Sequence, residues 1–136
     1  MSLIVGKYQR VSSENGDKFL KALGLGLNDK IIGEIISNFP TVINISHDGQ
    51  LWTVKRTSSK TETIQFREGE SYQGKNFNGT AMPVVTTIQG NKMMTISEPD
   101  GSTKPVKSVM TFSDDGMVLK IHGETVNWVI KYKRIE

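Results

Sequence analysis

The stretch GKYQRVSSENGDKFLKALGLG, residues 6–26, decides the fold of this chain. It begins as a strand, breaks at the polar residues 12–15 and continues as a short amphipathic helix with Phe19, Leu20 and Leu23 on one face. Nearly everything that follows the helical region is typical of strands and tight turns. This asymmetry predicts a mostly β fold with a small helical element near its start.

A second helix is expected over residues 28–38, where isoleucines recur with helical spacing. Asn28 or Asp29 can cap its start, and Pro40 prevents its continuation. The two short helices form a helix-turn-helix lid over residues 16–38. Neither helix presents a basic recognition face and neither contains an arginine, so the pair does not fit a DNA-binding motif, and no nucleic-acid partner is expected.

From residue 41 onward the hydrophobic period drops to two, which indicates β-strands. Short turns rich in Asp, Asn and Gly separate the segments, so sequential strands are expected to pair as an antiparallel meander. Ten meander strands split into two sheets or close into a barrel, because an open sheet leaves long unpaired edges, and we favour closure. The expected strands cover residues 6–13, 41–47, 51–58, 62–66, 71–73, 82–89, 92–97, 103–112, 117–122 and 126–134.

Length and composition point to one ordinary globular domain over residues 1–136. The chain has no cysteine, which excludes disulfides and thiolate chemistry and fits a reducing cytosol. The start, MSLIVG, is too short for the apolar region of a signal peptide, and no later run is long enough to span a bilayer. A cytoplasmic protein is therefore expected. The net charge of +3 is mildly basic.

The barrel interior is predicted from the alternation of side chains along each strand. In the last strand Trp128, Ile130 and Tyr132 share one face, which we assign to the interior. Small polar and methionine side chains recur elsewhere at positions where a packed core would carry Leu or Phe. A cavity of mixed polarity that holds some water fits them better than a dry core. They are Thr57, Ser58, Thr86, Thr95, Ser97, Ser108 and Met110.

Four segments carry a family resemblance: the opening stretch, DGQLWTVK at 48–55, KTETIQFREGESY at 60–72 and NWVIKYKR at 127–134. Together they resemble the intracellular fatty-acid-binding and retinoid-binding proteins over the whole chain, in a divergent, invertebrate-type form. The resemblance implies a ten-stranded up-and-down β-barrel capped by a helix-turn-helix lid. It implies a monomeric carrier that moves a hydrophobic ligand between membranes and enzymes, with no catalytic residues and no cofactor.

The resemblance also implies an anchor for the ligand that this chain lacks. Many members of the family bind the ligand's carboxylate with two inward arginines and a tyrosine, of which the last two form an Arg-x-Tyr pair. Here Tyr132 is present, but Ile130 stands in place of its arginine, and the other arginine position falls on or beside Met110. No arginine lies between Arg67 and Arg134. A buried carboxylate without a cation or several hydrogen bonds is strongly disfavoured, so the usual anchor is absent.

Two other arginines are candidates for this role. Arg10 lies two residues after Tyr8 on the same side of the first strand, and closure of the barrel pairs that strand with the last. Arg10 and Tyr132 are therefore expected to bind a carboxylate together. The alternative is that a local bulge turns Arg10 outward to solvent. Arg56, two residues after the inward Val54, is the second candidate. The predicted ligand contacts are completed by Ile130, Met110, Trp128, Phe19 and Ile35.

Several functions remain open at this level. The leading one is a carrier of long-chain fatty acids, and a carrier of retinoids or other neutral lipids is the alternative. A membrane-organising protein of the same fold, with a basic lid and another basic surface, comes next, and an enzyme acting on a lipid is a distant third. His47 and His122 have no further histidine nearby at ligand spacing, so no metal site is expected.

The lid carries Lys18, Lys21 and Lys30. They predict a transient contact with anionic membranes during ligand transfer. The alternative is that they only form a solvated helix face.

Overall fold

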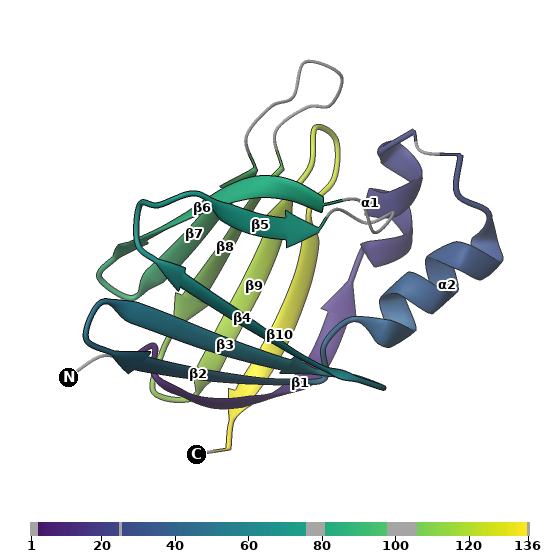
Figure 1. The fold of residues 1–136 in the computed structure, drawn as a ribbon. Coiled ribbons are helices and arrows are strands. Elements are labelled where there is room, and N and C mark those ends of the chain that lie inside the picture. The colour runs from purple at the N-terminus through teal and green to yellow at the C-terminus, as the bar shows by residue number, and fades with distance from the viewer. Residues whose placement is uncertain (1–2, 25, 76–80, 98–105, 136) are drawn as a thin grey trace.

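The computed structural model describes residues 3–24, 26–75, 81–97 and 106–135. Ten antiparallel strands form one sheet, and two helices lie between the first and second strands (Figure 1). In chain order the elements are β1 (Gly6–Glu14), α1 (Gly16–Ala22), α2 (Asp29–Asn38), β2 (Val42–Asp48), β3 (Leu51–Thr57), β4 (Thr61–Arg67), β5 (Tyr72–Lys75), β6 (Ala81–Gln89), β7 (Lys92–Ser97), β8 (Lys107–Phe112), β9 (Gly116–His122) and β10 (Trp128–Arg134).

The barrel closes where the first strand meets the last. The strand order is β4-β3-β2-β1-β10-β9-β8-β7-β6-β5, so β1 and β10 are neighbours and every other neighbouring pair is sequential in the chain. Among consecutive strands only β4 and β5 are not neighbours: they stand at the two ends of this order and form no backbone ladder among the described residues. The stacked rings of Phe66 and Tyr72, with centroids 5.2 Å apart, bridge this gap. The predicted ten-stranded barrel is confirmed, with one gap in its wall.

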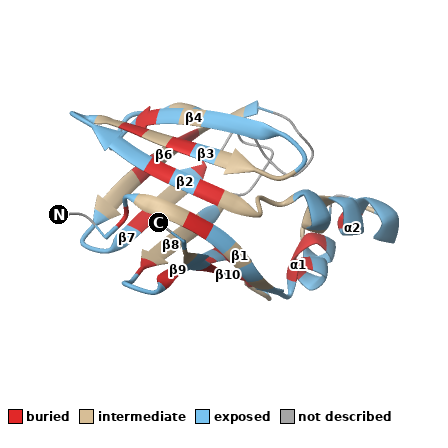
Figure 2. Ribbon diagram, turned by 90° about the horizontal axis from the view of Figure 1, so that it is seen from below, coloured by how far each residue is buried: buried red, intermediate tan, exposed pale blue. Residues whose placement is uncertain are grey.

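The two helices cover one end of the barrel, away from both termini (Figures 1 and 2). The predicted cap is confirmed, because Asn28 Oδ1 accepts a hydrogen bond of 2.9 Å from the backbone N–H of Ile31. The helix ends at Asn38, and its C-cap residue Phe39 is extended, one residue before Pro40. None of the helices in the described residues has the length and hydrophobicity that crossing a bilayer requires.

Alternation along the strands places the core as predicted. Trp128 and Ile130 are fully buried and Tyr132 is 4% exposed, while Val129 and Lys131 between them face outward. The Trp128 indole packs against Phe19 of α1 and donates from Nε1 to Ser13 Oγ at 2.8 Å. Gly16, the first residue of α1, lies so close that a Cβ there would be 2.9 Å from this indole. The start of the lid therefore packs directly on the last strand.

A β-bulge interrupts β1 where it pairs with β10. The register shifts between Arg10 and Ser12, and Val11 between them is 62% exposed. The bulge turns Val11 into solvent, while Arg10 stays half-buried. The expected alternative, in which a bulge exposes Arg10, is therefore wrong. The expected start of the eighth strand at residue 103 lies outside the described residues.

Candidate ligand-binding cavity

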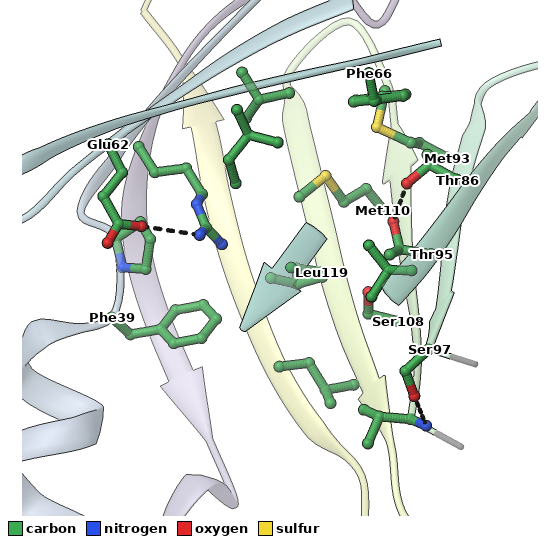
Figure 3. Close-up of a pocket in the computed structure, with 18 of the residues that line it drawn as sticks. Phe39, Glu62, Phe66, Thr86, Met93, Thr95, Ser97, Ser108, Met110 and Leu119 are labelled. Carbon is green, nitrogen blue, oxygen red and sulfur yellow. Dashed lines mark hydrogen bonds and ion pairs between the residues drawn. The ribbon is translucent and has the colours of Figure 1, made fainter. Parts of the chain in front are cut away.

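The barrel encloses a cavity of about 640 Å³ (Figure 3). Its walls come from the inward positions of β3–β9 and from the end of α2, and most of the side chains that line it are apolar. Because these positions alternate with solvent-facing ones, the strand period itself builds the cavity. The apolar lining includes Ile35, Phe39, Val54, Ile64, Phe66, Met82, Val84, Met93, Val106, Met110, Leu119 and Ile121.

The charged groups of the described lining all come from the β3–β4 hairpin: Arg56, Lys60 and Glu62. Arg56 and Glu62 are cross-strand neighbours, and Arg56 Nη2 donates to Glu62 Oε2 at 3.1 Å. Figure 3 shows Glu62 near Phe39, at the lid side of the cavity. The Arg56 Nε atom is buried and has no hydrogen-bond partner among the described residues. Arg56 therefore has a donor left for a further acceptor.

A row of hydroxyl groups lies on the wall formed by β5, β6 and β7. Tyr72 Oη is 2.6 Å from Thr86 Oγ1, which is 2.8 Å from Thr95 Oγ1. Figure 3 shows Thr86 and Thr95 on the side of the cavity away from Glu62. Three hydroxyls carry three protons and their two mutual hydrogen bonds use two, so one O–H remains for an acceptor outside the row. This wall can bind an uncharged oxygen.

Arg10 and Tyr132 are paired across β1 and β10, as closure of the barrel predicts. Arg10 Nη1 donates to the backbone oxygens of Ile36, at 3.2 Å, and Phe39, at 3.0 Å. These carbonyls lie at the end of α2, whose last turn has no basic residue of its own. Tyr132 Oη donates to the Pro40 backbone oxygen at 2.8 Å. Both side chains therefore hold the end of the lid on the barrel, and their contact with a carboxylate stays a prediction.

Burial raises the pKa of the Tyr132 phenol well above its ordinary value of 10.0, against the opposing charges of Arg10 and Arg56. The folded protein therefore keeps this proton where the unfolded chain loses it. Stability from this group is complete below pH 10 and falls as the pH rises above it.

We expect Tyr132→Phe to lower the free energy of unfolding by about 1 kcal/mol at neutral pH, because the hydrogen bond to Pro40 is lost. Urea unfolding between pH 8 and about 11 measures the difference from the wild type, which should shrink above pH 10. Burial also raises the pKa of Tyr8, but Tyr8 is present in both proteins, so its contribution to the pH dependence cancels in the difference. A difference that grows with pH would contradict the prediction.

The eight predicted ligand contacts fall into three places. Ile35, Arg56 and Met110 line the cavity. Arg10 and Tyr132 lie at the junction of the lid with the barrel and are absent from the described lining. Phe19, Trp128 and Ile130 belong to the packed core.

Sequence reasoning missed Glu62, Tyr72 and Phe39 as residues of the cavity. A signal for Glu62 was present, because a short turn after residue 57 places it across from Arg56. Phe39 was not predictable in this way, since its position depends on how the lid docks. Tyr72 lies beyond the gap in the sheet, where strand register gives no guide.

Comparison with known proteins gives relatives that match along their whole length. No family model matches the chain. A protein named fatty acid-binding protein from Tyrophagus putrescentiae is 32% identical over 131 residues, which cover 95% of each chain. Another of that name, from Lepidoglyphus destructor, is 30% identical and covers 98% of this chain and 99% of its own.

A solved structure of a protein with the same family name superposes on this chain. The fatty-acid-binding protein from brain tissue of Drosophila melanogaster superposes with a TM-score of 0.81 at 28% identity. The match covers 97% of this chain and 99% of that one. The superposition therefore includes both the barrel and the lid.

Proposed function

The chain belongs to the fatty-acid-binding protein family, and on that basis we propose that it is a cytoplasmic, monomeric carrier of long-chain fatty acids. It binds the fatty acid inside the barrel and moves it between membranes and enzymes, with no catalytic step. The observation that carries the proposal is a cavity of about 640 Å³ that combines an apolar lining with the half-buried cation Arg56. This volume lies within the range of about 300–1,000 Å³ that is usual for small-molecule sites.

The acyl chain and the carboxylate need different surroundings. The apolar side chains of β3–β9 remove the chain from water, at about 0.8 kcal/mol for each buried methylene group. The carboxylate needs a cation or several donors when it leaves water. Arg56 supplies these, because its guanidinium can present Nε and an Nη to one carboxylate in a bidentate pair.

Glu62 forms an ion pair with the Arg56 guanidinium. Its side chain is 53% exposed, whereas that of Arg56 is 33% exposed. An incoming fatty-acid carboxylate therefore takes the place of Glu62, whose carboxylate turns back into water at little cost. The exchange keeps the charge around Arg56 balanced, and it places the head group at the lid side of the cavity.

The test is a binding series with three C18 ligands: the free acid, its methyl ester and the primary alcohol. Displacement of a fluorescent fatty acid from the delipidated protein measures each affinity. We expect one site and tightest binding of the acid. Failure to bind any of the three would overturn the carrier proposal.

A carrier of neutral lipids, retinoids included, is the second candidate. The observation that favours it is the row Tyr72–Thr86–Thr95, which offers one hydroxyl proton without a charge. If this function is the right one, the C18 alcohol binds at least as tightly as the acid. Thr86→Val, which removes the middle hydroxyl at nearly constant volume, then weakens the alcohol and leaves the ester unchanged.

A further inference from the structure

The lid is a poor candidate for a basic membrane contact. Over residues 16–38 its three lysines are balanced by three acidic residues, Asp17, Asp29 and Glu34. Lys21 Nζ also lies 3.4 Å from Asp29 Oδ1. The net charge of this element is therefore zero, although its lysines stand out in the sequence.

The positive charge of the molecule is concentrated on the outer wall of the barrel instead. The strands β7, β8, β9 and β10 lie wholly in the described part of the chain, and their sequences contain no Asp and no Glu. Five lysines occupy outward positions there, and all five are exposed. They are Lys92, Lys107, Lys120, Lys131 and Lys133. We call them, with the side chains between them, the basic wall.

The lysines of the basic wall surround apolar side chains. Strand pairing places Val109 beside Lys120 and Met94 beside Val109, while Val118 faces Thr111. Together with Lys92, Lys107 and His122 these residues line a hollow of about 350 Å³ on the outside of the sheet. Val118 is 36% exposed and Ile96, also outward on β7, is 43% exposed. The wall thus joins cationic groups to apolar ones within a few strands.

We propose that the basic wall docks on the anionic surface of a lipid bilayer. Lysine ammonium groups attract anionic head groups, and the apolar side chains between them contact the acyl boundary. A nucleic acid would be served by outward arginines and several aromatic rings, whereas the outward positions of β7–β10 carry no arginine and a single aromatic ring, the His122 imidazole. The carrier therefore meets the membrane with its barrel wall, whichever lipid its cavity holds.

The test is co-sedimentation of the full chain with vesicles of phosphatidylcholine, with and without phosphatidylserine. Wild type should bind only the phosphatidylserine vesicles, and added salt should weaken the binding. The double variant Lys107→Glu/Lys120→Glu should bind about tenfold to a hundredfold more weakly. The matched control, Lys18→Glu/Lys30→Glu on the lid, should stay close to wild type.

Two further readouts make the result decisive. Both double variants should keep wild-type affinity for the C18 acid, because none of the four lysines is in the described cavity lining. Unchanged affinity for the C18 acid shows that the variants are folded. It also means that a loss of vesicle binding tests the docking proposal and not the proposed carrier function. Burial and the nearby Lys107 and Lys120 lower the pKa of His122, so bound anionic head groups should raise it, as an NMR titration would detect.

If the two double variants lost vesicle binding equally, the proposal would be overturned, because the net charge of the protein and not the basic wall would determine binding. Equal binding of wild type to both kinds of vesicle would also overturn it. So would tight binding to an oligonucleotide without binding to vesicles.

Discussion

Replacing Trp128 with alanine is expected to lower the free energy of unfolding by about 3–5 kcal/mol, the usual cost of truncating a buried tryptophan. Trp128 is fully buried, and its ring centroid lies 4.6 Å from that of Phe39 and 6.1 Å from that of Phe19. One side chain of β10 therefore holds both ends of the lid on the barrel. Its loss leaves a cavity that Gly16, which has no side chain, cannot fill.

Urea unfolding followed by far-ultraviolet circular dichroism measures this change. Ser13→Ala is the matched control, since it removes only the hydrogen bond from Trp128 Nε1 and should cost about 1 kcal/mol. Trp128→Phe should fall between the two. If Trp128→Ala cost no more than Ser13→Ala, the packing of the lid on β10 would not contribute as described.

Replacing Arg56 with methionine is expected to weaken binding of the C18 acid by roughly ten- to a hundredfold, the loss of hydrogen bonds to a charged group. The methyl ester should bind with unchanged affinity, because it offers no carboxylate. Glu62→Gln should act in the opposite direction. It removes the internal carboxylate that competes for Arg56, so the acid should bind more tightly.

Arg10→Met is the matched control for Arg56. Its guanidinium is bound to the backbone at the end of α2, so its loss should reduce stability and leave the preference for acid over ester in place. The reverse pattern, with the preference lost in Arg10→Met and kept in Arg56→Met, would move the anchor to Arg10 and Tyr132.

The sequence predicted the barrel because its determinants are local. Period-two strands and short turns fix nearly every antiparallel pair, and the inward face of β10 follows from alternation. The gap between β4 and β5 was not predictable, since the turn that joins them resembles the others. Its residues bond to β6 instead, with Gly69 N–H donating to the Thr86 backbone oxygen.

The polar contacts of the cavity were predictable only where they lie within one hairpin. Arg56 and Glu62 pair through a short turn, whereas Arg10 binds carbonyl groups of Ile36 and Phe39, at least 26 residues away. A guanidinium facing the end of a helix depends on how that helix docks. The charge of the lid does not depend on docking, because the acidic residues that balance its lysines stand beside them in the sequence.

The gap between β4 and β5 has a consequence for the timing of ligand exchange. A wall joined by backbone ladders opens only by breaking many hydrogen bonds together, and the β1–β10 ladder is of this kind. At the gap, the stacked rings of Phe66 and Tyr72 close the wall instead, and local opening there is less costly. Phe66, Tyr72 and the hydroxyl row belong to the same lining. We therefore expect this seam to open before the β1–β10 ladder does, so that a ligand in the cavity exchanges through it.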